Sequence, residues 1–211
     1  FIDQFAPSAA VVTNFAPDHL DWHSDLAAYA AAKARIFEKM SPGAPLVFDE
    51  DDPGAVDLVS AAATVRSPVS GIRLRADAEA DGFIRLGGAE VSVEGLGRSD
   101  AVMLVDLGMA AVAAAAVGAT PEGIARAALG YRPGAHRREV VAEIDGVTFV
   151  NDSKATNPHA ALAAIDSFPS VVLIAGGRAK GLDIRPLATA ASVHGLVAIG
   201  ESGPVLVEAR P

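Results

Sequence analysis

The sequence predicts an α/β protein with mostly parallel sheets, divided into two domains. Short runs rich in Val, Ile, Leu and Phe alternate with helical patterns along the chain, which is typical of parallel sheets covered by helices. The stretch Tyr131–Ala135 carries Pro and Gly between two differently patterned halves. The 211 residues are 51% hydrophobic, which is enough for packed cores. We therefore expect one domain over residues 1–133 and a second over 134–211.

The first half is expected to begin with a buried strand over residues 9–14, followed by a polar loop. Ser24 then caps a helix that runs to about Met40, because its apolar residues recur every three or four positions. Pro42 and Gly43 end this helix. The later elements are expected as strands at 45–48 and 61–66, an acidic turn at 49–52, short antiparallel strands at 72–75, 83–86 and 90–93, and helices at 101–117 and 121–129.

The second half is expected to open with a hairpin, because Asp145-Gly146 lies between two β-rich runs. The second run, 147–150, is expected to be a buried strand. Asn157 then caps a helix, and Pro158 fits its first turn, where a missing N–H costs nothing. The remaining elements are expected as a helix at 158–166, an apolar strand at 171–175, a glycine-rich loop at 176–181, and further α and β segments at 184–193 and 196–199.

Composition excludes several classes of protein. The net charge of −9 disfavours a nucleic-acid surface, which needs clustered Lys and Arg. The absence of cysteine excludes disulfides and thiolate metal sites. The window 101–119 is almost wholly apolar, but Asp106 interrupts it and alanine is a weak membrane residue, so a buried helix is expected there. We expect neither a nucleic-acid nor a membrane partner.

The loop between strand 147–150 and helix 158–166 is the first candidate site. Asp152, Ser153, Lys154 and Thr156 lie there, next to a helix N-terminus that favours anions. The alternative is an ordinary polar turn with a good cap. Loop chemistry alone leaves both interpretations open.

Two residues of the first half are further candidates. Lys33 falls on the apolar helix face, between Ala30 and Phe37. It either extends to water along the surface or is a functional lysine with a depressed pKa in a desolvated site. His19 suits a metal ion, although a single loop histidine also suits a polar surface.

Two segments of the second half offer groups for phosphate. His136, Arg137 and Arg138 follow the linker, and an arginine fork suits phosphate oxygens, although an exposed basic patch is the alternative. The glycines of 176–181 allow a ligand to approach the backbone closely. This loop lacks the GxxxxGK[ST] spacing, and no such motif occurs in the 211 residues.

Four segments, taken in order, resemble the Mur ligases of peptidoglycan synthesis. They read TNFAPDHLDWH with AAKARIFE, then HRREVV, VNDSKATNP and IAGGRAKGLD. The most specific, DSKATN, resembles the loop of the members that add D-glutamate. The likeness runs from about Pro7 to Gly200. It implies that residues 1–133 are the second half of a P-loop NTPase-like central domain, and that 134–211 are the first half of a Rossmann-like C-terminal domain.

The resemblance also implies a reaction. ATP phosphorylates the carboxylate of UDP-N-acetylmuramoyl-L-alanine, and the amine of D-glutamate attacks the acyl phosphate to give an amide. Mg²⁺ neutralises the phosphate charges. Such an enzyme is expected to be a cytoplasmic monomer that serves cell-wall synthesis, and through it cell shape and division.

The resemblance assigns roles by position. Lys33 would be carbamylated and would hold or orient metal, and His19 would bind magnesium. The remaining roles are ATP contact for His136 and Arg137, ribose contact for Asp152, adenine contact for Asp106 where many relatives carry asparagine, contact with the reacting carboxylate and D-glutamate for Ser153, Lys154 and Thr156, and D-glutamate binding for Lys180.

Two alternatives stay open beside this ligase. One is a folylpolyglutamate synthase-like ligase, which also joins glutamate to a carboxylate. The other is a truncated, non-catalytic nucleotide-binding module. The family's GTNGKT phosphate loop is expected to precede Phe1, so the chain resembles an internal segment, and the isolated segment is expected not to hydrolyse ATP.

Overall fold

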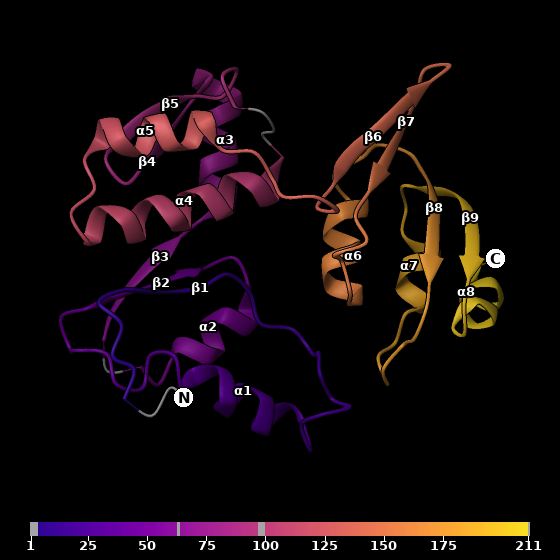
Figure 1. The fold of residues 1–211 in the computed structure, drawn as a ribbon, viewed down its shortest axis with the longest axis horizontal. Helices are drawn as coiled ribbons and strands as arrows, with labels where there is room; N and C mark the ends of the chain where they lie inside the picture. Colours follow the sequence, from indigo (N-terminus) through magenta and orange to yellow (C-terminus); the bar gives the residue numbers. More distant parts are fainter. Residues whose placement is uncertain (1–3, 63, 97–99, 211) are drawn as a thin grey trace. The chain divides into compact units, whose positions relative to one another are not determined.

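The computed structural model describes residues 4–62, 64–96 and 100–210, and it confirms the predicted α/β class (Figure 1). Its contacts divide the chain into two units. The first holds the described residues up to Ala16 together with Ser24–Arg132, and the second holds Pro17–His23 with the residues from Pro133 onward. The segment Pro17–His23 therefore belongs to the second unit. The assignment of 1–133 and 134–211 to two particular domain types stays a prediction.

A three-stranded parallel sheet forms one part of the first unit. Its order is β1 (Ala10–Val12), β2 (Pro45–Asp49) and β3 (Val65–Val69). Leu46 and Val47 of the central strand β2 are fully buried, and they belong to two different core clusters. Successive side chains of a strand point to opposite faces, so this central strand is covered on both sides, as expected of a parallel sheet.

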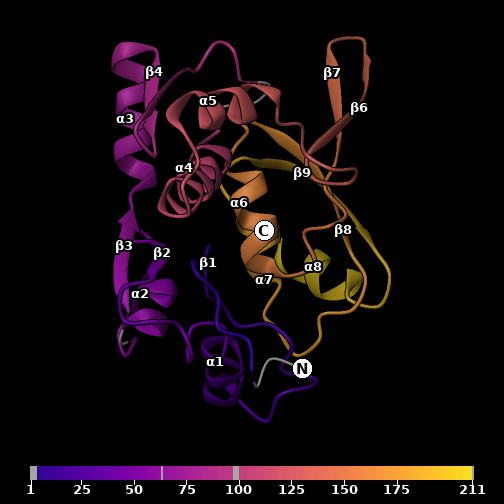
Figure 2. The ribbon, with the colours of Figure 1, turned by 60° about the vertical axis from the view of Figure 1, so that its left-hand side comes forward.

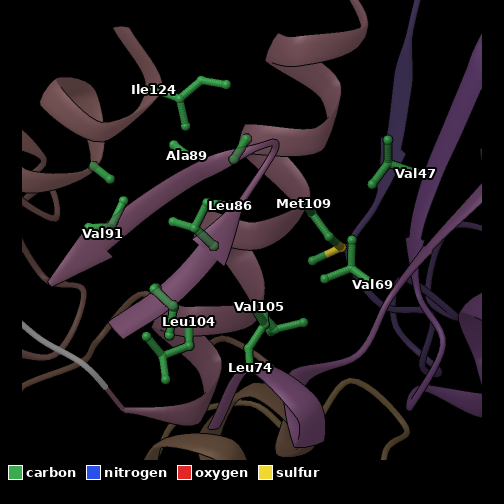
Figure 3. Close-up of a cluster of buried hydrophobic side chains, with 13 residues drawn as sticks. Val47, Val69, Leu74, Leu86, Ala89, Val91, Leu104, Val105, Met109 and Ile124 are labelled. Carbon is green, nitrogen blue, oxygen red and sulfur yellow. The ribbon is translucent and has the colours of Figure 1, made fainter. Parts of the chain in front are cut away.

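Helices and a hairpin build the rest of the first unit. These are α1 (Leu26–Ala34), α2 (Pro53–Val59), α3 (Gly71–Asp81), β4 (Phe83–Leu86), β5 (Ala89–Ser92), α4 (Ala101–Ala116) and α5 (Pro121–Gly130). Strands β4 and β5 are antiparallel, as predicted. Figure 3 shows Leu104, Val105 and Met109 of α4 among the side chains of the larger core cluster. None of the described helices is both long and apolar enough to cross a membrane.

The prediction of a strand at 72–75 was wrong, because these residues lie in α3. The Ser70 side chain accepts a hydrogen bond from the N–H of Arg73 at 3.2 Å, and the Asp51 carboxylate accepts one from Ile72 at 3.0 Å. Gly82 ends the helix with a φ of 68°. These capping signals outweigh the β-branched side chain of Ile72.

Three other boundaries differ from expectation. Asp25, and not Ser24, caps α1, and its carboxylate accepts from the Ala28 N–H at 2.7 Å. The α-helix ends at Ala34, and only turns continue beyond it. Strand β3 begins at Val65 rather than 61, and residue 63 lies outside the described ranges.

Helix α2 was not predicted, although Asp52 caps it by accepting from Ala55 at 2.6 Å.

The second unit contains a hairpin and an α/β layer (Figure 1). Its elements are β6 (Glu139–Ile144), β7 (Val147–Asn151), α6 (Pro158–Ile165), β8 (Val171–Gly176), α7 (Arg185–Thr189), β9 (Val193–Ile199) and α8 (Gly203–Ala209). Strands β8 and β9 are parallel. The core on their covered face holds the buried residues Ile165, Ile184, Leu187, Ala188, Val193 and Leu206. Helix α8 was not predicted.

The hairpin β6–β7 confirms the turn expected at Asp145-Gly146, where φ is 52° and 78°. The expectation that 147–150 is a buried strand was wrong, since Val147 is 57% and Phe149 44% exposed. Both views show the hairpin tip standing away from α6, α7 and α8 (Figures 1 and 2). Strand β7 pairs with β6 alone among the described strands.

Asp49, at the end of β2, stands among other carboxylates. Burial raises the pKa of Asp49, and the charges of Asp51, Asp52 and Asp106 raise it further. The N–H of Asp51, which donates to Asp49 Oδ1 at 3.0 Å, offsets only part of this. The charged form of Asp49 therefore costs folding free energy at neutral pH.

Replacing Asp49 by asparagine is expected to raise the thermal unfolding midpoint at pH 7 by a few degrees, because the amide keeps the oxygen that accepts from Asp51 and removes the charge. The gain should shrink as the pH falls through the raised pKa, where the wild-type carboxyl becomes protonated. Asp57→Asn, on exposed helix α2 surface, is the control. Equal midpoints for D49N and wild type at pH 7 would contradict the account.

Candidate functional site

The loop between β7 and α6 is held in one shape by its own side chains. The Asn157 Oδ1 accepts from the Ala160 N–H at 2.8 Å and caps α6, as predicted. The Asp152 carbonyl accepts from the Ala155 N–H at 2.8 Å, and Ser153 N–H donates to the Asn151 side chain at 3.1 Å. The exposed side chains of the loop therefore project from a fixed backbone.

The segment 136–138 packs against this loop. The His136 carbonyl accepts from the Lys154 N–H at 3.1 Å, and His136 Nδ1 lies 2.9 Å from the Asn151 amide nitrogen. Asp152 Oδ1 accepts from the Arg138 N–H at 3.0 Å. His136 and Arg138 both have positive φ, at 64° and 50°, a conformation that a non-glycine residue adopts only with support. The hydrogen bonds supply that support.

The two arginines of this segment differ. The guanidinium of Arg138 donates to Ser167 Oγ at 2.9 Å and to the Ala163 carbonyl at 3.4 Å, which ties β6 to the end of α6. Arg138 therefore stabilises the fold, and Arg137 is the exposed arginine of the pair. Of the basic groups predicted here for phosphate, His136 and Arg137 are the exposed ones.

The segment Pro17–His23 brings Asp18 and His19 to the same unit. Asp18 is only 7% exposed, and its Oδ2 accepts from the Asn157 amide at 2.9 Å. Its Oδ1 accepts from the His19 N–H at 2.8 Å, and the imidazole Nε2 lies 3.7 Å from Oδ2. The His19 carbonyl accepts from Trp22 and His23, so the segment forms a tight turn. The His19 side chain is exposed on this turn.

The electrostatics of Asp18 keep it charged. Burial by itself raises the pKa of the Asp18 carboxyl. The hydrogen bonds from Asn157 and the His19 N–H, with the nearby charges of His19 and Lys180, outweigh this and hold the pKa below its usual value. A buried carboxylate thus stands among the groups of the candidate site, and Lys180 is close enough to influence it.

The glycine-rich loop that carries Lys180 is braced against the end of β9. The Gly177 N–H donates to the Ile199 carbonyl at 3.2 Å, and the Gly177 carbonyl accepts from the Ser202 N–H at 2.9 Å. Lys180 itself has a φ of 52° and an exposed side chain. Loops at the carboxyl ends of parallel strands are where open α/β sheets bind ligands.

Two predicted site residues lie in the first unit. Lys33 is exposed, with its Nζ 5.2 Å from the centre of the Tyr29 ring. The Lys33 side chain therefore reaches water in the described unit, and its functional role stays a prediction. Asp106 is exposed on α4 and acts electrostatically on Asp49.

The second unit therefore brings together most of the predicted site. It holds His19, His136, Arg137, Asp152, Ser153, Lys154, Thr156 and Lys180, while Lys33 and Asp106 lie in the first unit. Sequence reasoning missed Asp18, and it saw Asn157 only as a helix cap. The signal for Asp18 was its place directly before His19 in a polar loop.

Magnesium prefers oxygen ligands and accepts an imidazole on occasion. Within the described ranges, no group of three or more His, Cys, Asp or Glu side chains could hold a metal ion. Both Asp18 oxygens already accept N–H donors, whereas the side chains of His19 and Asp21 are exposed on this segment. His19 fits one position of a magnesium shell whose other ligands would be phosphate and carboxylate oxygens.

Comparison with known proteins defines the class of this chain. A family model described as the Mur ligase middle domain matches residues 1–106. The chain belongs to the Mur ligase family, which confirms the predicted resemblance. Its relatives include proteins named UDP-N-acetylmuramoylalanine–D-glutamate ligase. The one from Frankia casuarinae is 45% identical over 186 residues, covering 84% of this chain and 39% of the relative. The one from Mycolicibacterium smegmatis is 40% identical over 216 residues, covering 96% and 42%.

Solved structures share the fold. MurF from Acinetobacter baumannii has a TM-score of 0.72 at 17% identity, over 97% of this chain and 49% of that one. MurF from Thermotoga maritima in complex with ADP has a TM-score of 0.69 at 17% identity, over 96% and 51%. The E. coli FolC complex with DHPP and ADP has a TM-score of 0.56 at 18% identity, over 96% and 51%. The chain spans about two fifths of the length of the curated relatives described above.

Proposed function

We propose that the complete gene product containing these residues is an ATP-dependent ligase that adds D-glutamate to UDP-N-acetylmuramoyl-L-alanine. The observation that carries this is the 45% identity to a ligase of that name. The DSKATN loop supports it, because its backbone is fixed by Asn157, Asp152 and the segment 136–138. A fixed polar loop suits a reaction that depends on placing several ligands close together.

We assign the nucleotide to the groups beside this loop. His136 and Arg137 present exposed side chains that suit the charged phosphates of ATP. Asp152 is half-buried at the start of the loop and suits the ribose hydroxyls, which donate to a carboxylate. In the first unit, Asp106 would contact the adenine. Its carboxylate can accept from the exocyclic amine, as an asparagine oxygen would.

We assign the carboxylates of the two substrates to exposed side chains of the β7–α6 loop and of the glycine-rich loop 176–181. Lys154 and Thr156, with Ser153, would bind the substrate carboxylate and the incoming amino acid. Lys180 would bind a carboxylate of D-glutamate. Each lysine supplies a compact positive charge, which suits the negative charge that develops on the acyl phosphate as the amine attacks.

In the second unit, His19 would be a magnesium ligand. In the first unit, a carbamate formed on Lys33 would hold or orient metal. The bound ion would supply charge neutralisation at the phosphates. The exposure of Lys33 supports the carbamate, because carbon dioxide must reach the amine. The Tyr29 ring beneath it limits the positions that the side chain can take. Since ATP and a nucleotide-linked sugar are its substrates, we place the enzyme in the cytoplasm, and we propose separately that it acts as a monomer.

A ligation assay with two acceptors tests the proposal. The complete gene product is mixed with ATP and Mg²⁺ and with either UDP-N-acetylmuramoyl-L-alanine plus D-glutamate or a folate plus L-glutamate, and ADP and the amide product are measured. Product is expected with the UDP-linked acceptor alone. Ligation to the folate alone would overturn the proposal in favour of a folylpolyglutamate synthase-like enzyme. If no ADP is released with either acceptor, the proposal is overturned in favour of a binding module.

A further inference from the structure

The hydrogen bond between Asp18 and Asn157 joins segments 139 positions apart in the sequence. The Asn157 side chain makes two bonds at once. Its oxygen caps α6 by accepting from Ala160 at 2.8 Å, and its nitrogen donates to Asp18 at 2.9 Å. The amide orientation is fixed by this pairing, because a cap needs the oxygen and a carboxylate needs the nitrogen.

Asp18 is matched to Asn157 in the same way. One carboxylate oxygen accepts from the Asn157 amide, and the other accepts from the His19 N–H at 2.8 Å. A buried carboxylate is costly unless each oxygen is satisfied, and here each oxygen has a donor. His19 has a φ of 54°, so its backbone needs such support. Asp18 therefore fixes the residue that follows it.

Each member of the pair thus precedes or follows a candidate site residue. His19 follows Asp18, and Thr156 precedes Asn157. We propose that Asp18 and Asn157 are a positioning pair that links the His19 turn to the Thr156 loop and, through this link, sets the geometry of ligation. The statement about ligation rests on the proposed function. The link itself rests on the two segments alone.

Exchanging the two side chains tests the pair directly. In Asn157→Asp the helix cap survives, but two carboxylates face each other at hydrogen-bond distance. In Asp18→Asn the new amide either turns its nitrogen toward that of Asn157 or leaves the His19 N–H without an acceptor. In the double variant D18N/N157D, an amide at position 18 again faces an oxygen at position 157. Cap, bridge and net charge are all restored.

The kinetic readout is the turnover number and the KM for D-glutamate of the complete gene product. Each single variant is expected to lower kcat/KM by about 10- to 100-fold, as sub-ångström to 1 Å misplacements do. The double variant is expected to recover to within about threefold of wild type, since it restores the matched pair. Losses that add in the double variant would overturn the proposal.

Asn157→Ser separates the cap from the link. Serine caps helices well but is too short to reach Asp18. We expect N157S to keep the thermal midpoint within a few degrees of wild type while it loses activity as D18N does. Wild-type turnover in N157S would show that the cap alone matters, and it would overturn the positioning role.

Hydrogen exchange keeps this test independent of the proposed function. In D18N and N157S, amides of both 18–23 and 152–157 are expected to exchange at least about tenfold faster, with residues 83–92 unchanged as the control. Faster exchange in one segment alone would overturn the link. If wild type lacks ligation but both segments loosen together, the proposed function fails and the link stands.

Discussion

Replacing Lys33 by alanine in the complete gene product is expected to lower ligation by about 100-fold or more, the scale of losing one preorganised catalytic group. The resemblance to Mur ligases implies that this amine becomes a carbamate. Lys33 is exposed, and its amine lies over the Tyr29 ring, so carbon dioxide can reach it without any rearrangement of a core. Ligation rate at saturating substrates is the measurement.

The controls separate a carbamate from a simple positive charge. Lys33→Arg keeps charge and stacking on Tyr29, but a guanidinium does not form the carbamate, so it should fail as alanine does. Short carboxylic acids are expected to restore part of the activity of K33A by replacing the carbamate oxygens. Lys39→Ala removes another exposed lysine of the same region and should leave the rate unchanged. Normal turnover in K33R would eliminate the carbamate.

Gly176→Ala is expected to lower the free energy of unfolding of the second unit by about 4 kcal/mol, which is more than most point substitutions cost. A Cβ at this position would lie 1.7 Å from the Ile199 carbonyl oxygen, and φ is +152°. Neither backbone can move easily, because Gly176 of β8 is paired with Ile199 of β9 in the parallel sheet. Chemical denaturation of the variant, followed by circular dichroism, measures the loss.

Gly177→Ala is the matched control. Its φ is also positive, at +102°, but no atom lies within 4 Å of the added Cβ. It is expected to cost about 1–2 kcal/mol, the range of backbone strain alone. The difference between the two variants isolates the contact with Ile199. Equal losses would mean that strain in φ, and not that contact, explains the glycine at 176.

Local signals in the sequence predicted local structure well. The turn at Asp145-Gly146, the cap Asn157, and the antiparallel pair β4–β5 are all present as expected. Each depends on residues a few positions apart, which determine backbone conformation directly. Helix α3 was missed because side-chain contacts of Ser70 and Asp51 fix its first turn, while its sequence shows no clear helical periodicity of apolar residues.

Long-range contacts set the limit of prediction. Strand β7 was expected to be buried, because a run of β-branched and aromatic residues is typical of a covered strand; Val147 is in fact 57% and Phe149 44% exposed. The candidate loop was predicted from its residues, but its contact with Asp18 was not. That bond spans most of the chain, and only the fold brings its two ends together.

The two enantiomers of glutamate give the most direct test of the central claim, that this chain is part of a D-glutamate-adding Mur ligase. The complete gene product is supplied with UDP-N-acetylmuramoyl-L-alanine, ATP, Mg²⁺ and either D- or L-glutamate at equal concentration, and the amide product is measured by mass. We predict product with D-glutamate and at least about 100-fold less with L-glutamate, since a site built for one placement of polar groups rejects the other. Equal or preferred use of L-glutamate would contradict the account.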